Sequence, residues 1–398
     1  MTLPLTGVRV VDLTRMFAGP CATAVLADLG AEVIKVEEPR IGDPTRRNLP
    51  LWGEESAYFM SLNRAKRSVT LDLKSAAGAT AVRELIGTCD VLVENYRPGV
   101  MARLGLDPET LTAAHPGLVY CSLSGFGATG PLRDKISFDL VNQAMAGTID
   151  LTGDPGQRPV RIGVPVGDMA GGLYLAAAAL AGLRARERTG RGSWVDLSLH
   201  DVLVSLLAGV AQRYFDTGEV PTRTGSRDRD VAPQGCYRAS DGWLVLSAVR
   251  DEHWRSLAET LGIPADDERF AGAERRKQHE PALDLLLEKQ LGERTVAQWA
   301  AALTAAGVPA APVLTLPDAL TSSLIRERGI DFDAVHPSVG TVRNLASPLV
   351  LDGRRAGVGA TSPVLGSDTD AVLRGLGYDD AGLAGLADAG VIRGVAWS

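Results

Sequence analysis

Short apolar runs alternate with longer amphipathic segments through the first third of the chain. The runs with the composition of buried strands are residues 8–12, 31–37, 68–73, 90–95 and 118–124. Helical patterns lie between them at residues 21–29 and 76–87, with further helical turns up to Ala114. A strand–helix–strand unit of about thirty residues joins parallel strands. The pattern therefore predicts an α/β domain with helices on both sheet faces, and ligands beyond the carboxyl ends of its strands.

A different pattern begins after a predicted strand at residues 193–199 and a predicted helix at 202–214. Residues 235–249 read as a hairpin turning at Ser240-Asp-Gly242, and helical patterns follow at 252–261, 281–291 and 295–306. Short strands and two helices close the chain. We therefore predict a large Rossmann-like domain, a linker and a smaller α+β domain. The expected boundaries are 1–215 for the large domain, 216–234 for the linker, 235–325 for the small domain and 326–398 for a segment that returns to the large domain.

One carboxylate stands among glycines at the predicted start of a buried helix. Asp168 lies in the stretch Gly163–Gly172 and precedes an apolar run at residues 173–180. Asp is favoured at helix N-caps, which is one interpretation of this residue. The other is a nucleophile, because a helix N-terminus favours an ionised carboxylate and glycines leave room for a bulky electrophile. The pattern alone leaves both open.

Composition and charge exclude several classes of function. The 398 residues are 45% hydrophobic and 22% charged, with a net charge of -7, which argues against non-specific nucleic-acid binding. No apolar run reaches the length of a membrane span, and the N-terminus lacks a signal-peptide pattern, so we expect no membrane partner. The four cysteines show neither metal-ligand nor CxxC spacing. We therefore expect reduced thiols, a cytoplasmic protein and no metal site.

Two patterns at predicted strand ends concern ligand binding. Gly125-Phe-Gly127-Ala-Thr-Gly130 matches a dinucleotide fingerprint, but no helical pattern follows it, so we interpret it as a loop that closes over a ligand. Basic residues recur before residue 104, and Arg97 directly follows a predicted strand. Such residues at strand ends suit a small molecule that carries phosphate. Asp139 is interpreted either as a helix cap or as a second acid near Asp168.

The chain resembles the class III CoA-transferase family over nearly its whole length. This family includes formyl-CoA transferases, carnitine CoA-transferases and α-methylacyl-CoA racemases. The resemblance is carried by segments in the family's order: Leu5-Thr-Gly-Val-Arg-Val-Val-Asp-Leu-Thr14, Ala18-Gly-Pro20, residues 27–37, Gly42-Asp43, residues 63–68, 71–74, 94–100, 124–127, 188–192 and Leu365-Gly366.

The resemblance implies an interlocked homodimer that uses acyl-CoA and a free carboxylic acid as substrates, with no permanently bound cofactor. The family's catalytic aspartate matches Asp168. The implied CoA contacts are Arg40, Leu71, Leu73, Lys74, Asn95, Tyr96, Arg97 and Arg103. The implied active-site loop positions are Phe17, Ala18, Gly125, Phe126, Gly127, Phe138, Asp139 and Gly171.

The implied reaction moves CoA between carboxylates through an anhydride and a thioester on Asp168. Backbone N–H groups of residues 125–130 or 171–172 are the expected donors to the oxyanions. Racemisation is the alternative, but it needs a base on each side of the α-carbon, and Phe138 stands where the racemases have histidine. A carrier of acyl-CoA without chemistry is a third hypothesis.

Two departures from the formyl-CoA transferases concern the acid that this chain accepts. Phe17 and Phe138 replace polar residues of those enzymes. Residues 231–236 contain one glycine where those enzymes have a run of glycines. We therefore expect an acid larger or less charged than oxalate, such as a branched, dicarboxylic or aromatic one.

Overall fold

The computed structural model describes residues 2–393 of the chain. The chain forms two compact units: unit 1 comprises the residues up to 148, residues 162–212 and those from 324 onward, and unit 2 comprises 149–161 and 213–323. The segment 149–161, predicted within the large domain, is grouped with unit 2 because Arg223 pairs with Asp150 at 2.9 Å and the Gly225 N–H donates to the Gly153 carbonyl at 3.0 Å. The last five residues of the predicted return segment, 394–398, lie outside the described residues.

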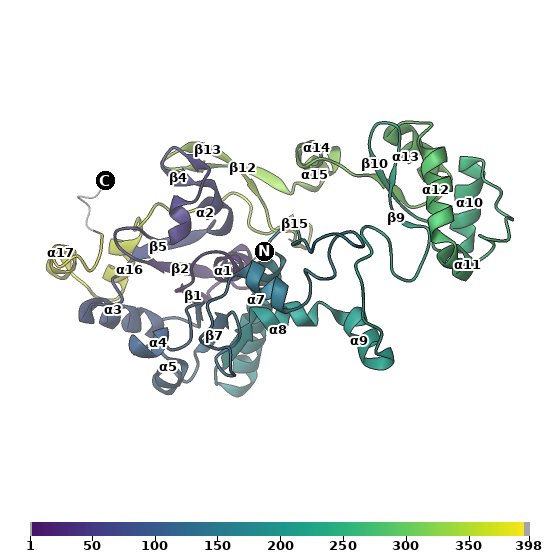
Figure 1. Ribbon diagram of the computed structural model, residues 1–398. Coiled ribbons are helices and arrows are strands. Elements are labelled where there is room, and N and C mark those ends of the chain that lie inside the picture. Colours follow the sequence, from purple (N-terminus) through teal and green to yellow (C-terminus); the bar gives the residue numbers. More distant parts are fainter. Residues whose placement is uncertain (1, 394–398) are drawn as a thin grey trace. The chain divides into compact units, whose positions relative to one another are not determined.

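Unit 1 is built on a six-stranded parallel sheet (Figure 1). In the order β5-β2-β1-β6-β7-β8, its strands are β5 (Lys66–Thr70), β2 (Glu32–Glu37), β1 (Arg9–Asp12), β6 (Val91–Glu94), β7 (Val119–Ser124) and β8 (Trp194–Ser198). The chain builds outward from β1 to β5 and then returns to the other side of β1 with β6. This reversal is the switch point at which doubly wound sheets bind ligands. The predicted α/β parallel sheet is confirmed.

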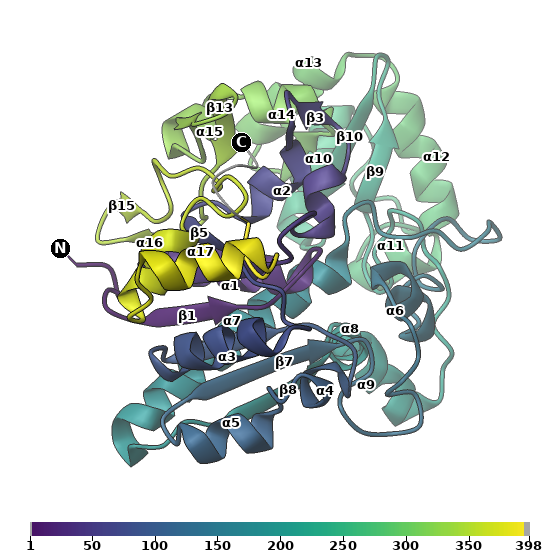
Figure 2. The same cartoon turned by 90° about the vertical axis from the view of Figure 1, so that its left-hand side faces the viewer.

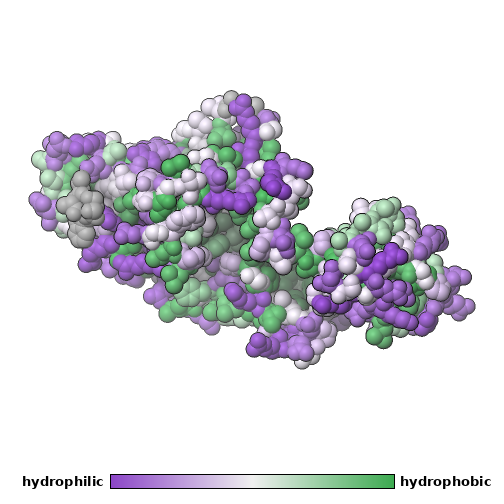
Figure 3. Space-filling view, turned by 90° about the horizontal axis from the view of Figure 1, so that it is seen from above, coloured by the Kyte–Doolittle hydropathy of each residue, from purple (hydrophilic) through white to green (hydrophobic). Residues whose placement is uncertain are grey.

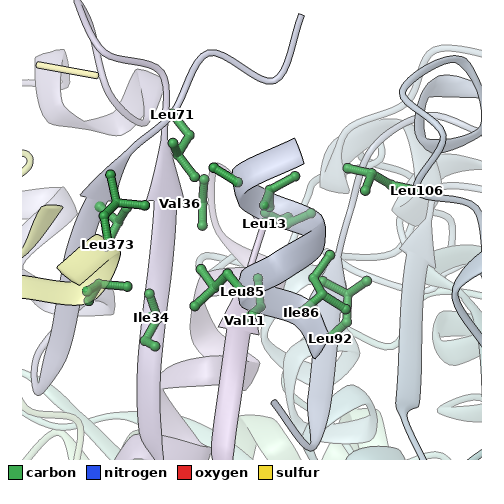
Figure 4. Packing of buried hydrophobic residues seen from close by; sticks show 14 of the residues in the cluster. Val11, Leu13, Ile34, Val36, Leu71, Leu85, Ile86, Leu92, Leu106 and Leu373 are labelled. Atoms are coloured by element: carbon green, nitrogen blue, oxygen red, sulfur yellow. The ribbon is translucent and has the colours of Figure 1, made fainter. Parts of the chain in front are cut away.

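Helices cover both faces of this sheet because successive strand side chains point to opposite sides. Val11 faces a core shared with α3 (Ala76–Gly87), α4 (Val100–Arg103), α5 (Pro108–Ala114), α16 (Thr369–Gly375) and α17 (Asp380–Asp388) (Figure 4). Val10 faces the opposite core, which contains α1 (Ala18–Asp28) and α7 (Val166–Thr189). α3 has the predicted bounds, and the Ser75 hydroxyl caps it by accepting from the Gly78 N–H at 3.0 Å.

The C-terminal segment closes the edge of the sheet at β5. The Asp368 carboxylate accepts from the Ser68 N–H at 3.0 Å, and the Thr369 hydroxyl accepts from the Thr70 N–H at 3.0 Å. Figure 2 shows the yellow helices α16 and α17 beside the purple N-terminal strands. These contacts join residues about three hundred positions apart in the sequence.

Two helices differ from the sequence-based prediction. The helix predicted at 202–214 is two helices, α8 (Leu199–Ser205) and α9 (Ala208–Thr217), because Ala208 has a positive φ of 36° that breaks the helical path. α7 runs beyond the apolar segment to Thr189, so it is long and apolar enough to span a membrane by length and composition. Its small residues pack against α1, β7 and α8, which describes a core helix of unit 1.

The remaining elements of unit 1 surround the ends of the sheet. They are the 3-10 helix η1 (Pro44–Arg47), β3 (Leu51–Trp52), β4 (Glu55–Ser56), α2 (Ala57–Leu62), α6 (Asp139–Met145), β12 (Asp331–His336), β13 (Gly340–Leu345), β14 (Val350–Leu351) and β15 (Arg354–Arg355), with α15 (Ser323–Arg328) starting at the unit's border.

Unit 2 has its own sheet and its own core. The antiparallel strands β9 (Gln234–Arg238), β10 (Trp243–Ser247) and β11 (Ala310–Pro312) are ordered β11-β10-β9. Tyr237, Leu246, Trp254 and Leu287 are fully or almost fully buried in this core. The helices are α10 (Asp251–Leu261), α11 (Ala273–Gln278), α12 (Glu280–Leu291), α13 (Val296–Ala305) and α14 (Leu316–Thr321); the sequence analysis did not predict α11 and α14.

Candidate active site

A cavity of about 560 Å³ lies at the carboxyl ends of β1, β2, β5 and β6. It is therefore at the sheet edge where the sequence predicts ligand binding, beside the switch point of the strand order. Of the expected CoA contacts, the cavity brings together five: Leu71, Leu73, Lys74, Tyr96 and Arg103. The lining is completed by Thr14, Arg15, Val36, Glu37, Glu38, Ile41, Gly42, Asp43, Pro44, Asp72, Val100 and Leu104.

Three exposed cations of this cavity are free to bind an anion. Arg15, Lys74 and Arg103 have no ion-pair partner among residues 2–393. The Arg15 guanidinium lies 4.4 Å from the centre of the Tyr96 ring, which holds it over the cavity wall. The sequence analysis placed the loop that contains Arg15 at a strand end but did not single out this residue. The arrangement is suited to a ligand that carries phosphate.

Three other expected CoA contacts do not line the cavity. Arg40 is exposed, and its guanidinium pairs with Glu38 at 3.1 Å. The Asn95 side chain makes two hydrogen bonds with the backbone of Arg15. Its Oδ1 accepts from the Arg15 N–H at 2.8 Å, and its Nδ2 donates to the Arg15 carbonyl at 2.7 Å. Arg97 is exposed beside the turn that starts α4. Asn95 thus holds the loop that presents Arg15.

Paired charges are buried beneath the cavity. The Lys66 ammonium lies 3.0 Å from the Asp12 carboxylate, and the Lys35 ammonium lies 3.0 Å from Asp43. Burial by itself raises the pKa of Asp12, but the two lysines and hydrogen bonds from Thr14 and Thr23 outweigh it and lower the pKa to about 2. These pairs fix the loops that follow β1 and β2, because Asp12 is the last residue of β1 and Asp43 caps η1, where the loop after β2 ends.

Asp168 lies in the first turn of α7, half-buried, and it does not cap that helix. The N-cap position is Pro165, whose side chain has no acceptor. Asp139 provides the cap instead: its Oδ1 accepts from the N–H of Gly167 at 2.8 Å and from the N–H of Asp168 at 3.2 Å. Within residues 2–393, no donor bonds the Asp168 carboxylate. The capping interpretation of Asp168 is therefore wrong, and Asp139 is both a cap and the neighbouring acid.

The surroundings of Asp168 disfavour its ionised form. Burial, followed by the negative charge of Asp139, raises the pKa of Asp168 to about 7. The sequence analysis expected the helix N-terminus to favour the carboxylate. Desolvation and a like charge act in the opposite direction and prevail. A carboxylate with a raised pKa and no hydrogen-bond donors is a strong nucleophile once it is ionised.

The glycines around Asp168 serve helix packing. An added Cβ would lie 2.7 Å from the Asp139 carboxylate at Gly167, 2.5 Å from Leu199 at Gly171 and 2.8 Å from the Ala18 carbonyl at Gly172. The expectation that these glycines leave room for a ligand is therefore wrong. Gly171 and Gly172 also lie inside α7, where their N–H groups bond the preceding turn, so they are not oxyanion donors.

The loop between β1 and α1 connects the cavity with Asp168. Thr14 and Arg15 line the cavity, whereas Ala18 packs against Gly172 of α7. Phe17 contacts the ring of Tyr58 with centroids 5.7 Å apart. Burial, followed by the charge of Asp168, raises the pKa of Tyr58 to about 12, so this phenol faces the same site. No sequence pattern marked Tyr58, because it comes from α2, which the strand–helix alternation did not include.

The loop of residues 125–130 is fixed against α6 and β8. Gly125 approaches Ser137 and Asn142, and the Asp196 carboxylate accepts from the Ala128 N–H at 3.0 Å. Phe126 packs on the ring of His200, and no helix follows the loop, so the dinucleotide interpretation is excluded. Phe138 precedes α6 and is 63% exposed, so its ring is available to a ligand or a partner. Among residues 2–393, no group of three His, Cys, Asp or Glu side chains is arranged to hold a metal ion.

Comparisons with known proteins agree with this geometry. The sequence model of the family described as CoA-transferase family III matches residues 5–369. Succinyl-CoA:glutarate CoA-transferase of Mus musculus is 36% identical over 98% of this chain and 90% of its own length. Acetyl-CoA:oxalate CoA-transferase of Acetobacter aceti is 39% identical over 79% of this chain and 82% of its own.

A solved structure supports the same assignment. A CAIB/BAIF family protein from Brucella suis superposes with a TM-score of 0.86 at 37% identity, covering 94% of this chain and all of the other. The matches in sequence and in fold thus both extend over nearly the whole chain. The chain therefore belongs to CoA-transferase family III, and it is an enzyme that transfers CoA.

Proposed function

We propose that this enzyme moves CoA from an acyl-CoA thioester to a free carboxylic acid through two covalent intermediates on Asp168. The observation that carries the proposal is the state of this carboxylate: half-buried, without a hydrogen-bond donor, and with a pKa raised to about 7 by burial and by Asp139. The cavity with its free cations supports a CoA ester as the ligand, and the loop from Thr14 to Ala18 leads from it to α7.

The chemistry balances without an added energy source. The Asp168 carboxylate attacks the thioester carbonyl, the C–S bond breaks, and a mixed anhydride forms as CoA thiolate leaves. The thiolate attacks the aspartyl carbonyl of the anhydride, which releases the donor acid and leaves an aspartyl-CoA thioester. The acceptor carboxylate then repeats the two steps in reverse and departs as its own CoA ester, which restores the Asp168 carboxylate.

We propose a dicarboxylic acid larger than oxalate as the acceptor. Relatives named succinyl-CoA:glutarate CoA-transferase support a short dicarboxylate, and the aromatic residues Phe17 and Phe138 support a site with apolar walls. Asp139 accepts three hydrogen bonds and faces Asp168 as a like charge, so it does not replace the second base that racemisation requires.

We also propose that the enzyme works as an interlocked homodimer in which unit 2 is the small domain. Large apolar side chains reach the surface of the single chain, as the green patches in Figure 3 illustrate. On α7 these are Met169, Leu173 and Tyr174. On α9, which buries none of its residues, they include Phe215 at 74% exposure. Exposed apolar area of this extent is typical of a protein–protein interface.

The proposal is tested by trapping the intermediate. The enzyme is incubated with succinyl-CoA and quenched with hydroxylamine, which converts an activated aspartyl group to a hydroxamate that peptide mass spectrometry locates. We expect the label on Asp168 and none in Asp168→Ala, which should lose CoA exchange while still binding CoA. Unchanged exchange in Asp168→Ala would remove this residue from the mechanism. Faster transfer to oxalate than to glutarate would contradict the proposed acceptor.

A further inference from the structure

Asp139 contacts Asp168 through the backbone of α7 and through charge. Its Oδ1 accepts from the second and third N–H groups of α7, those of Gly167 and Asp168, at 2.8 and 3.2 Å. These are the positions that an N-cap side chain serves, but here the acceptor comes from α6, because the N-cap residue of α7 is a proline. Asp139 therefore fixes the turn that carries Asp168.

Gln143 holds Asp139 in this orientation. Its Nε2 donates to the Asp139 Oδ2 at 2.5 Å, and its Oε1 accepts from the Ile162 N–H at 3.3 Å. Gln143 is fully buried and Asp139 is 8% exposed, so neither side chain has freedom to turn. Asp139 and Gln143 lie one helical turn apart on α6. Gln143 accepts from the backbone N–H of Ile162 before α7, and Asp139 accepts from two N–H groups in the first turn of α7.

We propose that Asp139, oriented by Gln143, is a positioning residue that fixes the first turn of α7 and keeps the Asp168 carboxylate reactive by facing it with an uncompensated negative charge. The inference rests on the proposed role of Asp168 as the nucleophile. Acylation converts Asp168 from a carboxylate to a neutral anhydride, so the repulsion from Asp139 weakens as the bond forms. An interaction that is less unfavourable in the transition state than in the ground state accelerates the step.

Among residues 2–393, the titratable groups that interact directly with Asp168 are Asp139, Tyr58 and Cys21. Lys66, whose pKa is lowered by burial to about 8, lies beyond Cys21 and pairs with Asp12. α2 contributes Tyr58, whose pKa is raised to about 12 by burial and by Asp168, and α1 contributes Cys21, whose thiol has a pKa raised by burial. α8 and β7 pack Leu199, Leu203 and Leu123 against the first turns of α7. The titratable residues of α8, His200 and Asp201, lie 3.5 Å from each other. The ionisation of Asp168 is thus governed locally by burial and Asp139.

The test separates the charge of Asp139 from its hydrogen bonds. Asp139→Asn keeps an oxygen for the two N–H groups of α7 and removes the charge, but it places an amide N–H₂ opposite the Gln143 Nε2. The double variant Asp139→Asn/Gln143→Glu restores an acceptor at that position, so comparing the two variants isolates the loss of this one hydrogen bond. We expect the acid limb of kcat/KM to move down by about one pH unit and the plateau to fall several-fold. Asp139→Ala also removes the cap, and we expect kcat to fall about ten- to hundredfold with an unchanged KM for acyl-CoA.

Asp379→Asn is the matched control, because Asp379 caps α17 in the same unit by accepting from the Gly382 N–H at 2.8 Å. This variant should keep the wild-type pH profile. An acid limb in Asp139→Asn that coincides with that of the wild type, at equal thermal stability, would overturn the inference. Hydroxylamine labelling keeps this outcome distinct from a failure of the proposed function: label on Asp168 with a wild-type pH profile in Asp139→Asn rejects only the role of Asp139, whereas absent label in the wild-type enzyme rejects the nucleophile itself.

Discussion

Asp12 and Asp168 are two carboxylates of unit 1 in opposite electrostatic environments. Asp12 is fully buried, lies 3.0 Å from the Lys66 ammonium, and has a pKa of about 2 because Lys66 and Lys35 outweigh the effect of burial. Asp168 is half-buried, faces Asp139, and has a pKa of about 7 through burial and that like charge. The residue type is the same, so the neighbours decide its state.

The different environments of Asp12 and Asp168 correspond to a structural role for Asp12 and a proposed chemical role for Asp168. The charge of Asp12 is matched by lysines and hydroxyls, and it stabilises the loops around the cavity. The charge of Asp168 is left unmatched, so the folded protein holds this carboxylate at a cost in stability that a reaction can release. Of these two carboxylates, the matched Asp12 belongs to the framework, and the unmatched Asp168 is the proposed reacting group.

The largest expected effect comes from substituting each aspartate by asparagine. Asp12→Asn leaves Lys66 buried without its partner and should lower the free energy of unfolding by about 3–5 kcal/mol. Asp168→Asn removes a carboxylate that the fold disfavours and should raise the free energy of unfolding at pH 8 by about 1 kcal/mol. Urea unfolding of the whole enzyme, followed by circular dichroism, measures both. If both substitutions changed the free energy of unfolding in the same direction, the two carboxylates would not differ in the way described.

The pH dependence gives the next largest effect. Asp168 must be ionised to attack, so kcat/KM should fall about tenfold for each unit below pH 7, to roughly a hundredth at pH 5. Asp12 has the opposite sign: its folded pKa lies below the usual 3.8, so it contributes about 2 kcal/mol of stability above pH 3.8, which is lost as the pH falls through 2. Activity measured from pH 5 to 9 beside circular dichroism should show loss of rate in a folded enzyme. Parallel loss of rate and fold would contradict this.

A smaller effect is expected at the cavity cations, which like Asp168 lack an opposite charge. Arg103→Ala or Lys74→Ala should raise KM for acyl-CoA about tenfold, since each removes a charge-assisted contact to phosphate, while kcat is retained. Initial rates at low and high salt measure this, and the difference from wild type should shrink as salt rises. An effect on kcat alone would place these cations outside the CoA site.

The smallest effect is expected at Arg40. This guanidinium is 78% exposed and already pairs with Glu38, so Arg40→Ala should change KM for acyl-CoA by less than about twofold. The same salt series measures it. A tenfold increase in KM would show that CoA binding draws Arg40 away from Glu38. Arg40 would then contribute as much to CoA binding as the unpaired cations Lys74 and Arg103.

Local sequence patterns predicted the sheet and its helices well. β1, β2, β6 and β7 lie within the expected apolar runs, and α3 has the expected bounds because a Ser cap at Ser75 and the helical period agree. The site near Asp168 was predicted in part. Its position in the first turn followed from the pattern, but its partners did not, since Asp139 and Ala18 approach α7 from distant parts of the chain.

The errors about the glycines near Asp168 have one physical cause. A glycine in the sequence indicates only that a Cβ is absent. The sequence does not show whether a ligand or a neighbouring helix occupies the space beside it. At Gly167, Gly171 and Gly172 the neighbours are Asp139, Leu199 and Ala18. Tyr58 and Arg15 likewise reach the site or the cavity from α2 and a loop, which hydrophobic periodicity does not place.

The tail that closes β5 has a consequence for synthesis of the protein. The edge N–H groups of Ser68 and Thr70 find their acceptors in Asp368 and Thr369, and the Asp72 N–H bonds the carbonyl of Val391. The ribosome synthesises Asp368, Thr369 and Val391 only near the end of translation. Unit 2 has left the ribosome by then. The nascent chain therefore carries an open strand edge until translation ends, and a truncation before residue 368 would leave that edge available for aggregation.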